Sequence, residues 1–305
     1  MKSLYILSVS SLLSELCAWA TSASEVEFDD TIRARLGPSV SVGEENARYM
    51  RAYVFTYTSL GKNIAGYIVV PKSAQSIPLP VIIFNRGGTK DFGSIKPGML
   101  FKHIADIARW GYLVVGSQYP GNSLSGGHDE WGGDDVQSIL DLYPLIQHLS
   151  IADEQRIGMF GESRGGMMTY LSLSQASWIR AAVTLAGAAN LVRGAALRPE
   201  MQAVYTEAFG GDEEGKKQRS AIFWPEKFPD NVPLLLLHGT ADWRVSPLDS
   251  IDLAAKLYEH KKPFQLIVYD GGDHGLSQFR NRWLDQTKLW FNRHLEQKDR
   301  EQSLA

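Results

Sequence analysis

The chain has 305 residues, of which 44% are hydrophobic and 21% are charged, and its net charge is −3. This length suits a single α/β domain with a small insertion, and the composition excludes a disordered chain. Lysine and arginine are scattered rather than gathered into a basic stripe, which argues against a nucleic-acid partner. We therefore expect a small-molecule or short-peptide substrate.

The first 23 residues have the pattern of a secretory leader. Lys2 precedes an apolar run over residues 4–13, and small residues at 18–23 offer cleavage sites. The run is too short to span a bilayer. We expect residues 1–23 to be removed and the protein to be exported, to a periplasm or to the medium. Glu15 fits this pattern poorly, and a buried N-terminal helix is the alternative.

The single cysteine, Cys17, lies inside the predicted leader. The expected mature chain, residues 24–305, therefore contains no disulfide, no zinc–thiolate site and no thiol nucleophile. Hydroxyl chemistry is what remains for covalent catalysis.

Strand patterns and helix patterns alternate along most of the chain. Two runs rich in β-branched and aromatic residues, 51–58 and 63–70, predict an antiparallel hairpin. Further predicted strands cover residues 81–84, 112–117, 156–160, 181–185, 233–237 and 263–268, and predicted helices cover 96–110, 135–149, 164–176, 246–259 and 276–294. Short apolar strands between amphipathic helices predict a mostly parallel central sheet with helices on both faces.

The alternation stops between residues 187 and 231, after the sixth predicted strand. This segment mixes aromatic residues with a charged run at 213–217. We interpret residues 187–231 as a small cap-like insertion within one domain covering 24–305. Its charged run is expected to face solvent, and its aromatic residues are candidates to line a substrate pocket.

The most specific motif is Gly-Glu-Ser-Arg-Gly-Gly at residues 161–166, the only Gly-x-Ser-x-Gly in the chain. It follows the predicted strand 156–160 and opens a predicted helix. Glycines flank such a serine because its strained turn brings strand and helix close together. Ser163 is therefore our candidate nucleophile.

A serine nucleophile needs a base and an acid later in the chain. Asp242 follows the predicted strand 233–237, and His274 lies in a glycine-rich loop after the next strand. The other two histidines beyond Asp242 fall on predicted helices. We assign His274 as the base and Asp242 as its partner, with Asp249 and Asp273 as lesser candidates for the acid.

The tetrahedral intermediate of acyl transfer requires two hydrogen-bond donors for its oxyanion. We expect one to be the main-chain N–H of Arg164, the residue after the nucleophile. The other is expected from the loop after strand 81–84, where Gly87 is the first choice and Gly88 the second. The alternative for this loop is an ordinary strand-to-helix turn.

Neither a metal nor an organic cofactor is expected. Residues 119–135 contain a histidine and several acids, but their spacing matches no strong metal-ligand motif. Asp134 or Asp135 is better explained as the N-cap of the following helix. The chain also lacks a P-loop and a dinucleotide fingerprint.

Three residues are candidate substrate contacts. Arg86 is a candidate to bind a substrate carboxylate, and Tyr119 and Trp243 lie in loops at the expected site. The side chain of Arg164 is a second candidate for the carboxylate. Trp131 is a further candidate for the rim. An arginine near such a rim is equally often paired with a structural acid, for example Glu162.

Together these motifs resemble the catalytic domain of the prolyl oligopeptidase family and, more loosely, the dienelactone hydrolases. The resemblance covers residues 52–295 and rests on the segments 85–88, 119–135, 161–166, 238–242 and 273–275. It implies an α/β-hydrolase fold and a serine-type peptidase or esterase. Family peptidases usually carry a β-propeller before this domain, which residues 24–51 are too short to form.

Two further departures concern specificity. The turn at residues 85–88 reads Asn-Arg-Gly-Gly rather than the family's usual His-Gly-Gly, and Arg164 stands where an aromatic residue often follows the serine. We expect a serine hydrolase that cleaves ester or amide bonds through an acyl-enzyme. The alternatives are a carboxylesterase or lactone hydrolase without peptidase activity, and a non-catalytic binding protein of the same fold.

Overall fold

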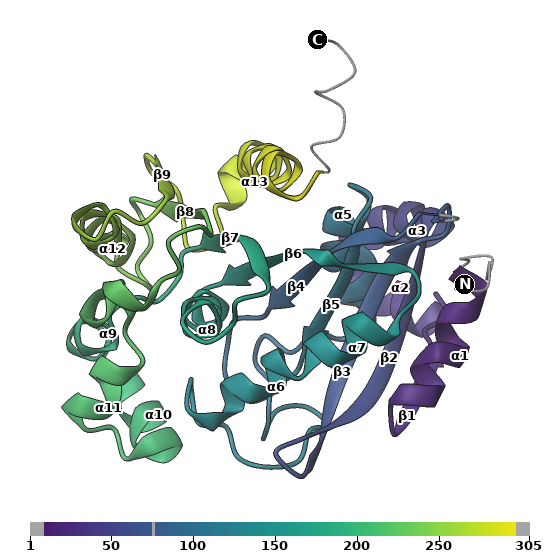
Figure 1. Cartoon of the computed structure of the whole chain (residues 1–305), viewed down its shortest axis with the longest axis horizontal. Coiled ribbons are helices and arrows are strands. Elements are labelled where there is room, and N and C mark those ends of the chain that lie inside the picture. Colours follow the sequence, from purple (N-terminus) through teal and green to yellow (C-terminus); the bar gives the residue numbers. More distant parts are fainter. Residues whose placement is uncertain (1–8, 75–76, 297–305) are drawn as a thin grey trace.

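The structure, a computed structural model, describes residues 9–74 and 77–296, and its centre is a nine-stranded sheet (Figure 1). The strands lie in the order β1-β2-β3-β5-β4-β6-β7-β8-β9. Their bounds are β1 (Ser22–Glu25), β2 (Met50–Ser59), β3 (Lys62–Pro71), β4 (Leu79–Asn85), β5 (Leu113–Ser117), β6 (Ala152–Glu162), β7 (Ile179–Leu185), β8 (Leu234–Gly239) and β9 (Phe264–Tyr269). All pairs from β5 to β9 are parallel, and β1, β2 and β3 add an antiparallel edge.

Helices cover both faces of this sheet. Their bounds are α1 (Val9–Trp19), α2 (Asp30–Leu36), α3 (Val40–Tyr49), α4 (Pro97–Met99), α5 (Ala105–Ala108), α6 (Gln137–Leu140), α7 (Leu142–His148), α8 (Arg164–Leu173), α9 (Leu191–Leu197), α10 (Glu200–Phe209), α11 (Glu213–Gln218), α12 (Pro247–Glu259) and α13 (Arg280–Leu295). Side chains of α1, α6, α7, α8 and α12 share one core cluster, and those of α2, α5 and α13 share the other. The expected α/β architecture is confirmed.

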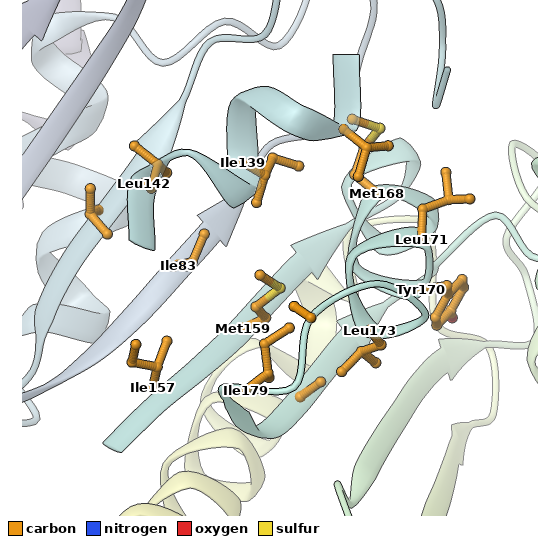
Figure 2. Packing of buried hydrophobic residues seen from close by; sticks show 14 of the residues in the cluster. Ile83, Ile139, Leu142, Ile157, Met159, Met168, Tyr170, Leu171, Leu173 and Ile179 are labelled. Carbon is orange, nitrogen blue, oxygen red and sulfur yellow. The ribbon is translucent and has the colours of Figure 1, made fainter. Parts of the chain in front are cut away.

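The first cluster forms the layer beneath the nucleophile. Figure 2 shows part of it, with Ile83 of β4 and Met159 of β6 lying near Ile139 of α6 and Met168 of α8. These four side chains are fully buried. Because α8 begins directly after the candidate serine, this packing fixes the position of that serine relative to the sheet.

One strand was not predicted, and two predicted helices differ from the structure. The strand β1 was not predicted, so the insertion follows the seventh strand rather than the sixth. The predicted helix 96–110 consists of α4, a π-helical turn at Leu100–Ile104 and α5. The predicted helix 135–149 is interrupted at Asp141, because Pro144 has no N–H to donate to the carbonyl four residues earlier.

The segment predicted as a leader is partly described. Its residues 9–19 form α1, whose Leu12 and Leu16 are buried in the first core cluster. The Glu15 carboxylate accepts a 2.7 Å hydrogen bond from the main-chain N–H of Ser150. Cleavage of the leader in the cell stays a prediction. Within the described part of the chain, no helix is both long and apolar enough to cross a membrane.

The insertion forms α9, α10 and α11 near α8 and α12 (Figure 1). It contacts the loop between β5 and α6, where the rings of Tyr205 and Trp131 meet edge to face at 5.3 Å. Lys90, in the loop after β4, forms a 2.6 Å ion pair with Glu207. The insertion therefore covers the loops at the carboxyl end of the parallel strands, where open α/β sheets place their sites.

Candidate active site

Ser163 lies in a strained turn between β6 and α8. Its φ of 56° and ψ of −120° fall in a region that non-glycine residues rarely occupy. A Cβ at Gly165 would lie 1.9 Å from the Asn85 carbonyl oxygen, and one at Gly161 would lie 2.2 Å from the Gly165 carbonyl oxygen. Both glycines are therefore required by close main-chain approach, as the motif predicted.

The start of α8 provides one expected donor for an oxyanion. Arg164 is the first residue of this ten-residue helix. The N–H groups of a first helical turn have no acceptor within the helix, and the helix dipole adds positive potential there. The main-chain N–H of Arg164 is therefore suited to bind developing negative charge beside Ser163.

The loop after β4 brings a second main-chain segment to the nucleophile. A Cβ at Gly87 would lie 3.2 Å from the Cβ of Ser163 and 3.0 Å from the Glu162 carbonyl oxygen. Gly88 follows with a φ of +79°, and a Cβ there would collide with the Phe92 carbonyl oxygen. The structure thus places Gly87 against the serine. Its part as the second donor stays a prediction.

His274 and Asp242 are hydrogen-bonded. The Nδ1 atom of His274 lies 2.8 Å from the Oδ2 atom of Asp242. Because a carboxylate only accepts, Nδ1 carries the proton and Nε2 is left to take one from a nucleophile. Burial raises the pKa of Asp242, but the hydrogen bonds from its two histidine neighbours dominate and hold this pKa well below its ordinary value.

The second of these histidines, His238, was not singled out from the sequence. It is fully buried, and its Nε2 lies 3.1 Å from both Asp242 Oδ2 and the carbonyl oxygen of Val245. Two acceptors at this nitrogen require that it carries the proton. Its Nδ1 then accepts from the hydroxyl of Ser250 at 2.7 Å. Its position four residues before the acid, at the end of a buried strand, was the available signal.

The two lesser candidates for the acid have other partners. The carboxylate of Asp249 accepts two 2.9 Å hydrogen bonds from the main-chain N–H groups of Ala189 and Asn190. That of Asp273 accepts a 2.8 Å hydrogen bond from the N–H of Ser277. The geometry therefore favours Asp242, which also accepts two main-chain hydrogen bonds at Oδ1.

Ser163 and His274 line one cavity of about 450 Å³ at this end of the sheet. Gly87 and Arg164 line it as well. Its apolar wall is formed by side chains of the loop after β4, of α4, of the β5–α6 loop, of the insertion and of the last helix, namely Phe92, Ile95, Met99, Trp131, Met201 and Trp283. The space suits a small ligand with an apolar group.

Arg86 braces the loop that follows β4. Its side chain is buried, and it donates to the main-chain carbonyl oxygens of Gly87, Lys90, Phe92 and Gln118 at 2.9 to 3.4 Å. These contacts occupy its guanidinium. The expectation that Arg86 binds a substrate carboxylate is therefore corrected: the side chain shapes the oxyanion loop.

Of the other two candidate substrate contacts, Tyr119 is buried and Trp243 is exposed. Tyr119 is fully buried and donates from its hydroxyl to the Arg86 carbonyl oxygen at 3.1 Å. It lies behind the cavity wall, which corrects its assignment as a substrate contact. Trp243 is exposed, and its ring lies 5.5 and 5.1 Å from the guanidinium carbons of Arg198 and Arg244, which line the cavity. Its place is at the rim.

The loop between β5 and α6 carries two buried acids that meet the side chain of Arg164. Asp129 binds the guanidinium with both oxygens, and Asp135 Oδ2 lies 3.1 Å from Nη2. Burial raises the pKa of Asp135 to about 6, against the opposing effect of Arg164. Asp135 also accepts from the N–H of Gly132. The expectation that Asp134 or Asp135 is the N-cap of the following helix is corrected: Gly133 precedes the 3-10 turn Asp134–Val136, and no side chain caps that turn. Asp135 is instead an ion-pair partner of Arg164.

A second titratable pair borders the cavity. His103 Nε2 lies 2.9 Å from Glu162 Oε1, and both side chains are about a quarter exposed. The Glu162 carboxylate raises the pKa of His103. His103 projects from the π-helical turn at Leu100–Ile104, which sequence periodicity does not reveal. This pair was not predicted. The sequence suggested an arginine as the partner of Glu162, and the structure gives it His103 instead.

Among the described residues, no group of three or more histidine, cysteine, aspartate or glutamate side chains has an arrangement suited to a metal ion. Three acids of the segment 119–135, namely Asp129, Glu130 and Asp135, accept hydrogen bonds from other groups of the protein. Asp129, for example, also accepts from the Trp131 N–H at 3.2 Å.

Comparison with known proteins decides the family. A family model described as the prolyl oligopeptidase family matches residues 101–298, about two thirds of the chain. The chain belongs to the prolyl oligopeptidase family. Since its members are serine peptidases and the motif serine lies in the geometry described above, the protein is a serine hydrolase.

One relative of similar length is a protein of Bacillus subtilis named an uncharacterized peptidase, YtmA. It is 27% identical over 241 residues, which cover 77% of this chain and 91% of the relative. The mouse prolyl endopeptidase FAP is 25% identical, over 70% of this chain but 29% of its own length. The chain therefore corresponds to part of that larger family member.

Solved structures of family peptidases share the fold. The acylaminoacyl peptidase of Pyrococcus horikoshii aligns with a TM-score of 0.72 at 24% identity, over 83% of this chain and 43% of that chain. A puromycin-hydrolyzing peptidase of Mycobacterium tuberculosis aligns with a TM-score of 0.67 at 21% identity, over 78% and 38%. This chain spans less than half of either peptidase.

Proposed function

We propose that the protein hydrolyses amide bonds of short peptides or related small amides through an acyl-enzyme on Ser163. The observation that carries this proposal is the shared cavity, which is lined by the strained Ser163, by His274 and by Gly87 and Arg164. Asp242 holds His274 from behind through a 2.8 Å hydrogen bond. The peptidase names of its relatives support an amide rather than only an ester substrate.

In the proposed reaction each group has its own step. The Oγ atom of Ser163 forms a bond to the substrate carbonyl carbon while its proton passes to Nε2 of His274. The N–H groups of Arg164 and Gly87 hold the oxyanion. When the carbon–nitrogen bond breaks, His274 gives the proton to the leaving amine. Asp242 holds the imidazole tautomer and stabilises the imidazolium throughout.

Deacylation repeats the sequence with water as the nucleophile. His274 removes a proton from the water as its oxygen bonds to the acyl carbon, and returns that proton to Oγ of Ser163 as the ester bond breaks. The carboxylic acid leaves and the serine is restored. Every proton passes through one imidazole, so the chain's own residues suffice for this reaction.

The cavity indicates the size of the acyl group. Its volume of about 450 Å³ and its wall of Phe92, Trp131 and Met201 suit one bulky apolar side chain or a short acyl group. Trp243 at the rim is placed to contact the part of the substrate that extends outward.

A matched pair of chromogenic substrates tests the proposal. An N-blocked dipeptide p-nitroanilide and the p-nitrophenyl ester with the same acyl group would be compared on the purified protein and on Ser163→Ala. Cleavage of both by the unsubstituted protein, lost in the variant, is the expected result. Cleavage of the ester alone would indicate a carboxylesterase without peptidase activity. Cleavage of neither substrate would contradict both the peptidase and the carboxylesterase.

We also propose export of the chain, supported by Lys2, the apolar run at 4–13 and the small residues at 18–23. Removal of residues 1–23 would take away α1 and the first two residues of β1. The intact mass of the protein recovered from the exported fraction tests this proposal. A chain that begins near Ser24 is expected, and a protein that retains α1 in the cell interior would contradict it.

A further inference from the structure

The side chain of Arg164 has no part in the proposed reaction, yet it is among the largest fully buried side chains of the protein. The reaction uses only its main-chain N–H. A guanidinium that is removed from water beside the nucleophile is costly unless its hydrogen bonds are well satisfied. The groups that surround this guanidinium therefore indicate its role.

Two carboxylates and two aromatic rings surround this guanidinium. Asp129 binds it through both oxygens, with one contact of 2.8 Å from Nη1, and Asp135 accepts from Nη2 at 3.1 Å. The guanidinium carbon lies 5.2 Å from the ring centre of Tyr119 and 4.8 Å from that of Trp131. The bidentate fork and the stacking contacts fix its orientation.

The same group reaches the oxyanion loop. Nη1 of Arg164 donates to the Gly88 carbonyl oxygen at 3.2 Å, one residue beyond the candidate donor Gly87. The indole N–H of Trp131 donates to the hydroxyl of Thr89 at 3.1 Å, in the same loop. One side chain thus connects the start of α8, the loop after β4 and the loop between β5 and α6.

We propose that the Arg164 side chain, clamped by Asp129 and Asp135, is a positioning residue that holds the two oxyanion donor segments in register. This inference rests on the proposed function. The donors act on charge that develops in the transition state, so a loss of register lowers kcat with little change in KM. The expected loss is smaller than the 10²- to 10³-fold that follows removal of a donor.

The test compares Arg164→Met with Arg193→Met on p-nitrophenyl butyrate. Arg193 is a matched control, because it also pairs with two acids, Asp249 and Asp252, and it does not line the catalytic cavity. We expect kcat to fall by roughly 10- to 100-fold for Arg164→Met, with KM within about threefold and with Arg193→Met near the unsubstituted protein.

Two further measurements separate positioning from general destabilisation. The inhibition constant of a trifluoromethyl ketone, whose adduct with serine carries an oxyanion, is expected to rise by the same factor as kcat/KM falls. Arg164→Lys keeps the charge but lacks the planar fork, so it is expected to restore little of kcat. Folding of each variant is checked by its Tm.

The result that overturns the clamp is a folded Arg164→Met protein with unchanged kcat, or one whose loss appears only in KM. A loss equalled by Arg193→Met would also overturn it. Failure of the proposed function looks different: the unsubstituted protein and Ser163→Ala would then be equally inactive.

Discussion

Buried carboxylates make the stability of this protein depend on pH. Burial raises the pKa of Asp135 to about 6, so the folded state binds its proton more tightly than the unfolded chain does. The stabilising contribution of this proton is fully present below about pH 4 and is lost as the pH rises through about 6. This rise of the Asp135 pKa corresponds to roughly 3 kcal/mol in the free energy of unfolding.

Asp135→Asn removes this titration. We compare the free energy of unfolding of the variant with that of the unsubstituted protein at each pH. The difference, variant minus unsubstituted, is expected to become more positive by roughly 3 kcal/mol from pH 4 to pH 7. Urea unfolding at a series of pH values measures this difference. Burial also raises the pKa of Asp249 to about 6. Because Asp249 is present in both proteins, its contribution cancels in this difference. A difference that does not change with pH would contradict the assignment.

The histidine behind the acid is expected to affect the reaction without touching substrate. In His238→Gln, Asp242 loses the fixed imidazole donor at Oδ2 and holds His274 less firmly, so kcat should fall by roughly tenfold. His260→Gln, on the exposed end of α12, is the control and should leave kcat unchanged. Equal kcat values for the two variants in steady-state kinetics would contradict this role of His238.

Some residues of the site are marked by a short sequence motif, and others are not. Ser163 was predictable because the elbow needs glycines at fixed offsets, and His274 because it lies in a loop after a strand. His238 and His103 depend on contacts across the fold, which no short motif encodes. Arg86 and Tyr119 were assigned to the substrate because a sequence does not show which side chains turn into the core.

At the scale of elements, the junction of β6 and α8 depends on glycine at position 165. An added methyl group there would meet the main-chain oxygen of Asn85 at 1.9 Å, and neither backbone can withdraw without moving β4. Gly165→Ala is therefore expected to lower the free energy of unfolding by about 3 kcal/mol. Chemical denaturation measures the change.

Gly194→Ala is the control for that experiment. Gly194 lies within α9, and its added Cβ would make only an ordinary 3.5 Å contact with the Tyr205 hydroxyl. Alanine is the better helix former, so stability is expected to be unchanged or up to about 1 kcal/mol higher. Equal destabilisation by both substitutions would show that the elbow has no special need for glycine.

The elements that were predicted are those with strong periodicity. The hairpin of β2 and β3 and the alternation from β4 to α13 follow from runs of apolar residues. The strand β1 has only four residues and pairs along the edge of β2, so its register depends on a distant segment. The π-helical turn at Leu100–Ile104 has the same apolar pattern as a continuous helix and was therefore missed.

At the scale of the whole molecule, α1 closes one end of the first core cluster. In the full-length chain, Leu16→Ala would empty a fully buried position and is expected to cost about 2 to 5 kcal/mol. Ser14→Ala, on the exposed side of the same helix, should change stability by less than about 0.5 kcal/mol. Equal Tm values for the two variants would contradict the packing of α1.

The insertion and the loops at the carboxyl edge of the sheet build the site from segments that are distant in the chain. Ser163, Asp242 and His274 follow three different strands, and the parallel order β6-β7-β8-β9 brings these strand ends to one edge. The family pattern predicted this arrangement. The clamp around Arg164 was not predicted, because the sequence assigned Asp134 or Asp135 to helix capping and gave Asp129 no partner.

The assignment of Ser163 as the nucleophile is tested most directly by covalent labelling of the full chain with a fluorophosphonate, with the label located by peptide mass spectrometry and turnover of an aryl ester measured in parallel. We expect one label at Ser163 and a loss of turnover of about 10⁴-fold or more in Ser163→Ala. A folded protein that is labelled elsewhere, or that keeps its turnover without Ser163, would contradict it.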